Sequence, residues 1–188
     1  MKIKVHARNI DTKLRLALFA MTEFALARLI PSRRLRNNLS INIHLKHHVH
    51  GGEVMMSETT NWLWIGEKIS ATLYNFNAKE GWKFNLIGMA ERPMMMEYEE
   101  GGGKYDWHID LGPSRLASTR KLSFSLFLND DYEGGEFQIK TGRENYIPPE
   151  QETGNLLFFP SYLVHRVTLV TKGTRMAIVG WVHGNSFQ

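Results

Sequence analysis

His108-Ile109-Asp110 is the stretch of this sequence that most constrains the fold, because His165 and Arg175 follow it at informative distances. Residues i and i+2 of a strand project to the same side, so His108 and Asp110 can face one metal ion from a strand end. His165 lies 55 residues after Asp110 and must come from another strand that folds back against the first. Two imidazoles and one carboxylate, with other metal positions open, are typical of a non-haem Fe(II) oxygenase centre.

Arg175 lies ten residues after His165, and Gly173 is placed to form the turn between two strands. That spacing returns the guanidinium group to the same end of the sheet as the metal ligands. The planar fork of arginine binds a carboxylate through two parallel hydrogen bonds. We therefore expect Arg175 to bind the carboxylate of a co-substrate.

The composition fits one globular domain of 188 residues, with 43% apolar and 11% aromatic residues. The chain has no cysteine, which excludes disulfides, thiolate zinc sites and cysteine nucleophiles. Since a cysteine-free chain fits a reducing compartment, we expect a cytoplasmic protein. The longest apolar run, from Leu16 to Met21, is far short of a membrane span, so no membrane association is expected.

The charge is divided unevenly along the chain. Residues 1–50 carry ten Lys and Arg against two acidic residues, whereas residues 51–188 carry 13 against 17. The basic segment is either a solvated helix packed on an acidic domain or a patch that binds nucleic acid or an acidic partner through Arg33, Arg34 and Arg36. Its histidines suggest either a loop or a zinc site, and no glutamate stands between His44 and His48 as a metallopeptidase helix would need.

Hydrophobic periodicity predicts two helices, over residues 12–30 and 58–77, and a half-buried strand over residues 39–45. From residue 82 onward the pattern changes to short strands separated by Gly-rich or Asn/Asp turns. The expected strands are Trp82–Ile87, Pro93–Tyr98, Tyr105–Ile109, Lys121–Leu128, Gly135–Ile139, Asn155–Phe159, His165–Thr171 and Arg175–Val182. Such a series predicts a closed or sandwiched β architecture preceded by helices.

The chain resembles the Fe(II)/2-oxoglutarate-dependent dioxygenases, in the prolyl-hydroxylase-like branch that includes the PKHD-type hydroxylases. The resemblance covers roughly residues 57–185. It rests on Tyr98, ten residues before His108, and on four segments that match the family's motifs. These segments are residues 105–110 (YDWHID), residues 120–129 (RKLSFSLFLN) with 133–136 (EGGE), residues 158–161 (FFPS), and residues 165–175 (HRVTLVTKGTR) with Trp181.

This resemblance implies a mainly β fold with flanking helices, in which N-terminal helices support a double-stranded β-helix (jelly-roll or cupin-like) core. We assign residues 56–188 to that domain and residues 1–55 to a basic helix-strand extension that packs on it or forms an appendage. The implied cofactors are Fe(II), 2-oxoglutarate as co-substrate and O2, with ascorbate as a candidate stimulant. The implied iron ligands are His108, Asp110 and His165, and Arg175 and Tyr98 are the implied 2-oxoglutarate contacts.

The implied activity is hydroxylation of an unactivated C–H bond, with succinate and CO2 as co-products. A protein side chain, proline first, is the leading substrate, and a free amino acid or small molecule is the alternative. Asp110 favours hydroxylation, since halogenating relatives lack this carboxylate. Two positions depart from relatives: Phe127 stands where some prolyl hydroxylases have a tyrosine, and Trp181 stands where the nucleic-acid-dealkylating branch has a second arginine.

Overall fold

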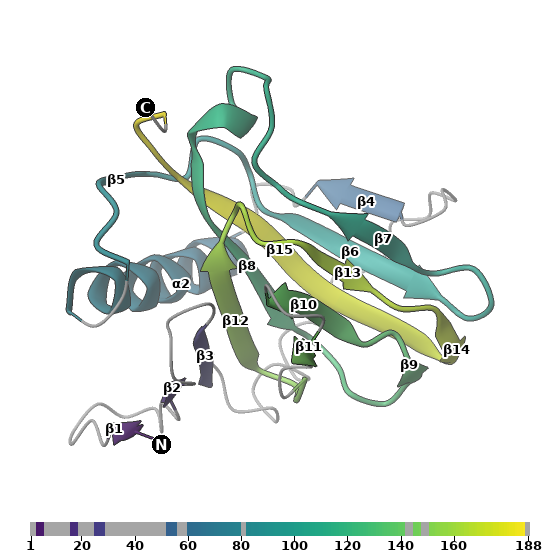
Figure 1. The fold of residues 1–188 in the computed structure, drawn as a ribbon. Coiled ribbons are helices and arrows are strands. Elements are labelled where there is room, and N and C mark those ends of the chain that lie inside the picture. The colour runs from purple at the N-terminus through teal and green to yellow at the C-terminus, as the bar shows by residue number, and fades with distance from the viewer. Residues whose placement is uncertain are drawn as a thin grey trace.

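The computed structural model describes residues 3–5, 16–18, 25–28, 52–55, 60–79, 82–141, 145–147 and 151–186. In this part of the chain, two antiparallel sheets face each other and one long helix, α2 (Thr60–Lys79), packs against the larger sheet (Figure 1). This is the expected jelly-roll-like β core with a supporting helix.

Among the described residues, the larger sheet has nine strands, and the long strand β15 lies near its centre. In spatial order they are β1 (Ile3–Val5), β2 (Leu16–Leu18), β3 (Ala25–Arg28), β12 (Asn155–Pro160), β8 (Arg120–Phe127), β15 (Thr174–Gly184), β6 (Met94–Glu99) and β4 (Gly52–Met55), with β5 (Leu86–Gly88) beside β15. The central strands β12, β8, β15 and β6 provide one wall of the space between the sheets.

The smaller sheet provides the opposite wall. Its strands, in spatial order, are β11 (Asn145–Ile147), β10 (Phe137–Thr141), β13 (His165–Val167) and β7 (Tyr105–His108). Strands β14 (Val170–Lys172) and β9 (Glu133–Gly134) form a separate pair, and a short 3-10 helix (Ala117–Thr119) precedes β8. The predicted strand over residues 165–171 is therefore two strands. The chain leaves the smaller sheet after β13 and then pairs with β9 as β14.

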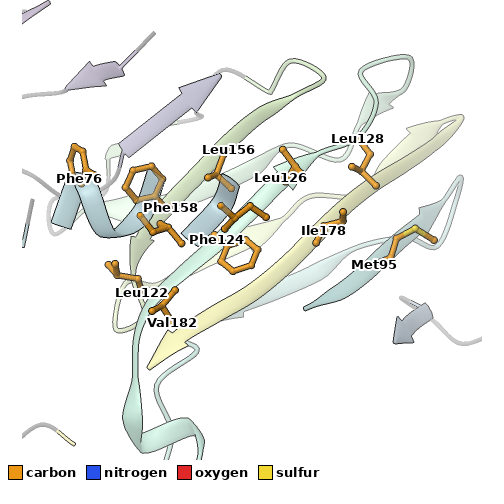
Figure 2. Close-up of a cluster of buried hydrophobic side chains, with 12 residues drawn as sticks. Phe76, Met95, Leu122, Phe124, Leu126, Leu128, Leu156, Phe158, Ile178 and Val182 are labelled. Carbon is orange, nitrogen blue, oxygen red and sulfur yellow. The ribbon is translucent and has the colours of Figure 1, made fainter. Parts of the chain in front are cut away.

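One face of the larger sheet packs against α2. Alternate residues of β8 point to this face because successive side chains in a strand project to opposite sides. Figure 2 shows Leu122, Phe124 and Leu126 of β8 together with Phe158 of β12 and Phe76 of α2. Burial of this apolar cluster holds the helix on the sheet.

The intervening residues of the same strands face the space between the two sheets. Phe127 of β8, Leu157 and Phe159 of β12, and Met96 of β6 belong to a second buried cluster. Phe137 of β10 meets them from the smaller sheet. The larger sheet is therefore covered on both faces, which explains why residues 121–127 of β8 are all buried.

The prediction of one helix over residues 12–30 is wrong at Leu16–Leu18 and Ala25–Arg28, which are strands. β3 pairs with β12, where Leu26 lies opposite Leu157. Without β3, that side of β12 would present unpaired backbone groups, and antiparallel pairing satisfies them. This long-range pairing outweighs the local helical periodicity.

Several sequence-based predictions lie outside the described residues: the strand over residues 39–45, the cluster of His44, His47, His48 and His50, and the arginines at 33, 34 and 36. The division of the chain at residue 55 stays a prediction. None of the helices in the described part of the chain is long and apolar enough to cross a membrane.

Candidate metal centre

Two strands of the smaller sheet bring the three predicted ligands together. His108 ends β7 and His165 begins β13, and these two residues lie opposite each other in the antiparallel pairing. Asp110 follows β7 by two residues. His108 Nε2 lies 3.6 Å from Asp110 Oδ1, and His165 Nε2 lies 3.6 Å from Asp110 Oδ2. Ligand atoms of all three residues lie within 4.8 Å of one another, so a single ion can contact them all.

Hydrogen bonds orient both imidazoles for metal binding. Nδ1 of His108 lies 2.7 Å from the carbonyl oxygen of Asp106, and Nδ1 of His165 lies 2.9 Å from that of Leu163. We assign the proton to Nδ1 in each ring because a carbonyl oxygen can only accept, which leaves the Nε2 lone pair free. Burial lowers the pKa of His165, and this outweighs the opposing effect of Asp110, so the neutral, ligating form is favoured.

Two serines from the larger sheet's side of the site hold Asp110. The Ser123 hydroxyl donates to Asp110 Oδ2 at 2.6 Å, and Ser123 Oγ lies 3.0 Å from Ser161 Oγ. The backbone carbonyl of Ser161 accepts hydrogen bonds from the amides of Asp110 and Leu111, both at 3.0 Å. Both serines are buried. The carboxylate is therefore fixed in position by its own backbone and by a neighbouring hydroxyl.

Arg120, at the start of β8, supports the same loop. Its Nη1 donates to the Asp110 carbonyl oxygen at 3.1 Å, and its Nε and Nη2 donate to the two carboxylate oxygens of Glu91 at 2.7 and 2.6 Å. Its guanidinium carbon lies 3.6 Å from the centre of the Trp181 ring. All three guanidinium nitrogens thus donate a hydrogen bond, which makes Arg120 a rigid support rather than a free cation.

Arg175 lies in β15 with 1% of its surface exposed, opposite Tyr98 of β6 in the strand pairing. Its Nε and Nη2 have no hydrogen-bond partner among the described residues. Burial lowers the pKa of Arg175, and the nearby Tyr132 and Tyr98 side chains raise it. A buried guanidinium with unsatisfied donors is costly unless a ligand with acceptor oxygens completes it.

A single cavity of about 720 Å³ joins the triad to Arg175. The triad, Arg175 and Tyr98 all line it. Tyr105 also lines it, with its ring centre 4.1 Å from that of His108, and Trp181 contributes another wall. The five residues singled out in the sequence as site residues are therefore brought to one cavity by four strands and one loop.

The residues at this site fit Fe(II) and a 2-oxo dicarboxylate. Two imidazoles and a carboxylate leave metal positions open, and this set of ligands suits Fe(II). The orphaned Nε and Nη2 of Arg175 suit a carboxylate in the same cavity. The metal-binding triad thus suits the keto-acid end of such a ligand, and the unpaired N–H groups of Arg175 suit its other carboxylate.

Sequence reasoning missed Ser123, Ser161 and Tyr132. Ser123 could have been noticed, since it is one of only two hydroxyl-bearing residues in an otherwise apolar run over residues 122–128. Ser161 belongs to a matched motif but its contact with Asp110 is not visible in the sequence. Tyr132 reaches Arg175 from a loop, and no periodic pattern points to it.

The sequence profile of the 2OG-Fe(II) oxygenase superfamily matches residues 93–183. The chain is similar to a PKHD-type hydroxylase of a Synechococcus species, with 37% identity over 121 residues, covering 63% of this chain and 52% of that protein. It is also similar to a PKHD-type hydroxylase of Gloeothece citriformis, with 43% identity over 105 residues, covering 52% of this chain and 47% of that protein. The chain thus spans about half the length of these relatives.

Solved structures show the same fold. A prolyl-4-hydroxylase of Pseudomonas putida aligns with a TM-score of 0.68 and 17% identity, covering 88% of this chain and 95% of that one. A prolyl hydroxylase of Trichoplax adhaerens in complex with a hypoxia inducible factor peptide fragment aligns with a TM-score of 0.66 and 17% identity, covering 87% of this chain and 84% of that one.

Proposed function

We propose that the protein is a 2-oxoglutarate-dependent dioxygenase that hydroxylates an unactivated C–H bond, and the match of residues 93–183 to the sequence profile of the 2OG-Fe(II) oxygenase superfamily supports this proposal. Succinate and CO2 are the co-products. The observation that carries this proposal is the shared cavity, in which a complete His-Asp-His triad and a buried arginine with unsatisfied donors face the same space.

In this proposal His108, Asp110 and His165 hold Fe(II), and bound iron supplies the oxidation chemistry with O2. Arg175 binds the distal carboxylate of 2-oxoglutarate, and Tyr98 lies beside it as a further contact. The protein positions the two co-substrates and keeps water away from the reacting bond, which suits a site walled by two packed sheets. Ascorbate as a stimulant stays a prediction.

A protein or peptide side chain, proline first, is the proposed substrate. Tyr105, Ile109 and Leu116 line the cavity while 43–48% of their surface is exposed, so they form an apolar rim at its mouth. An apolar rim of this kind suits a peptide segment that flanks the target residue. The peptide-bound relative from Trichoplax adhaerens supports this choice. A small free amino acid is the alternative substrate, and a cytoplasmic location stays a prediction from the cysteine-free composition.

The test is succinate formation from 2-oxoglutarate by protein reconstituted with Fe(II) under anaerobic conditions and then exposed to O2. We expect turnover with Fe(II), and stimulation by a proline-rich peptide mixture with a gain of one oxygen atom on the peptide. His165→Ala and Asp110→Ala should abolish turnover, because each removes a ligand that has no substitute among the described residues nearby.

Lys172→Ala is the matched control, since it removes an exposed ion pair with Glu133 on the separate β9–β14 pair. Its turnover should equal that of the unchanged protein. Full turnover by His165→Ala would show that the triad is assigned wrongly. Turnover without any effect of peptide would favour the small-molecule substrate.

A further inference from the structure

Ser125 is a buried hydroxyl in an apolar setting. It lies in β8 with 2% of its surface exposed and lines the cavity described above. Its neighbours on the two adjacent strands are Val179 of β15 and Leu157 of β12, which lie directly opposite it in the pairing. Neither side chain can accept or donate a hydrogen bond.

The Ser125 hydroxyl has no hydrogen-bond partner among the described residues. Leaving such a group buried and unsatisfied destabilises the folded protein, because the hydroxyl loses its hydrogen bonds to water and gains none in return. Native structures satisfy nearly all such groups with protein, water or ligand. Because the residues directly opposite Ser125 on both adjacent strands are apolar, the remaining direction for a partner is the cavity itself.

The position of Ser125 along β8 places it between the two ends of the site. Ser123, two residues before it, donates to Asp110 at the metal triad. Phe127, two residues after it, has its ring 5.5 Å from the Arg175 guanidinium carbon. The three side chains share one face of the strand, and at about 3.3 Å per residue Ser125 lies roughly 6.6 Å from each neighbour along it.

We propose that the Ser125 hydroxyl donates a hydrogen bond to a carboxylate oxygen of bound 2-oxoglutarate, as a further binding residue beside Arg175. This inference rests on the proposed function, since it assumes that the ligand spans from the triad to Arg175. A ligand of that length passes the only hydroxyl on this face of β8 that has no protein partner. Phe127 offers no donor there, so Ser125 supplies one that the aromatic ring cannot.

The first test is binding of 2-oxoglutarate to the Mn(II)-loaded protein, measured by isothermal titration calorimetry without turnover. Ser125→Ala should raise the dissociation constant about tenfold, since a hydrogen bond to a charged group is lost. Ser125→Thr keeps the hydroxyl and should stay within about threefold of the unchanged protein. Ser118→Ala, which removes a hydroxyl that donates to the Arg115 carbonyl outside the cavity, is the matched control and should change nothing.

The second test separates a ligand contact from a structural role. Because the hydroxyl is unsatisfied without ligand, Ser125→Ala should unfold at an equal or higher temperature than the unchanged protein when no 2-oxoglutarate is present. The rise in melting temperature caused by 2-oxoglutarate should be smaller in the variant. A lower melting temperature without ligand, together with an equal ligand-induced rise, would show that Ser125 is structural and overturn the inference.

A third comparison finds which carboxylate is bound, using 2-oxobutanoate, which lacks the distal carboxylate. If Ser125→Ala weakens 2-oxoglutarate but not 2-oxobutanoate, the contact is to the distal carboxylate; if both weaken equally, it is to the keto-acid end. Either result supports the inference. If Ser125→Ala and the unchanged protein bind 2-oxoglutarate equally, the inference about Ser125 is overturned and the proposed function is not. If the unchanged protein does not bind 2-oxoglutarate, the proposed function is overturned as well.

Discussion

Single hydrogen bonds decide the orientation of the candidate metal ligands. The Ser123 hydroxyl donates to Asp110 Oδ2, while Oδ1 faces Nε2 of His108. The Ser123 hydroxyl does not position Asp110 alone, since the Ser161 carbonyl also accepts a hydrogen bond from the Asp110 amide. Partners of this kind fix a ligand's rotamer before the metal arrives.

We predict that Ser123→Ala weakens metal binding about tenfold or more, because the carboxylate loses the hydroxyl that orients it. The measurement is the dissociation constant of Mn(II) by calorimetry or by competition with a chelator. Ser123→Thr should restore most of the affinity. The same affinity in Ser123→Ala and the unchanged protein would show that backbone contacts alone orient Asp110.

At the scale of elements, strand β8 carries two functions on its two faces. One face packs on α2 through the cluster drawn in Figure 2, and the other presents Ser123, Ser125 and Phe127 to the cavity. Leu73 of α2 is completely buried in the first cluster, whereas its neighbour Tyr74 is 39% exposed. The helix therefore packs on, and stabilises, the sheet that carries the site.

We predict that Leu73→Ala lowers the free energy of unfolding by about 2–5 kcal/mol, as expected when a buried leucine leaves a cavity. Urea denaturation followed by tryptophan fluorescence measures it. Tyr74→Ala on the same helix is the control and should cost less than about 1 kcal/mol, because its side chain is partly exposed. Equal losses in the two variants would contradict the packing of α2 described above.

At the scale of the whole molecule, the metal site links the two sheets. His108 and His165 belong to the smaller sheet, whereas Asp110 is held by Ser123 of the larger sheet. A ligand that binds all three residues therefore favours the state in which both sheets are in place. Metal binding should stabilise the entire fold and not one loop.

We predict that saturating Mn(II) raises the melting temperature by roughly 5–10 °C, since a concentration 100 times the dissociation constant adds about 2.7 kcal/mol. Scanning calorimetry with Mn(II), and again after excess EDTA, measures the rise and its reversal. Asp110→Asn should remove most of the rise because the carboxylate charge is lost. An equal rise in that variant would place the stabilising metal elsewhere.

Local patterns were sufficient for α2 and for the strands β6, β7, β8, β10, β12 and β15, because alternation and helical periodicity match their surroundings there. They did not predict β9 or β11, and they joined β13 and β14 into one strand. They were insufficient at Trp82–Ile87, where only Leu86–Gly88 forms a strand, and over residues 12–30. In both segments, pairing with a strand distant in sequence determines which residues are extended: β5 lies beside β15, and β3 lies beside β12.

The sequence by itself determined which residues form the candidate site, because His108, Asp110, His165, Arg175 and Tyr98 stand at spacings that a strand sandwich brings together. Only the tertiary structure decided how these residues are supported. The hydroxyl of Ser123 on Asp110, the phenol of Tyr132 near Arg175 and the unsatisfied hydroxyl of Ser125 all depend on which side chains meet across the sheets. Spacing along a chain fixes which face a side chain occupies, but its partners come from strands far away in sequence, and only folding brings them within hydrogen-bonding distance.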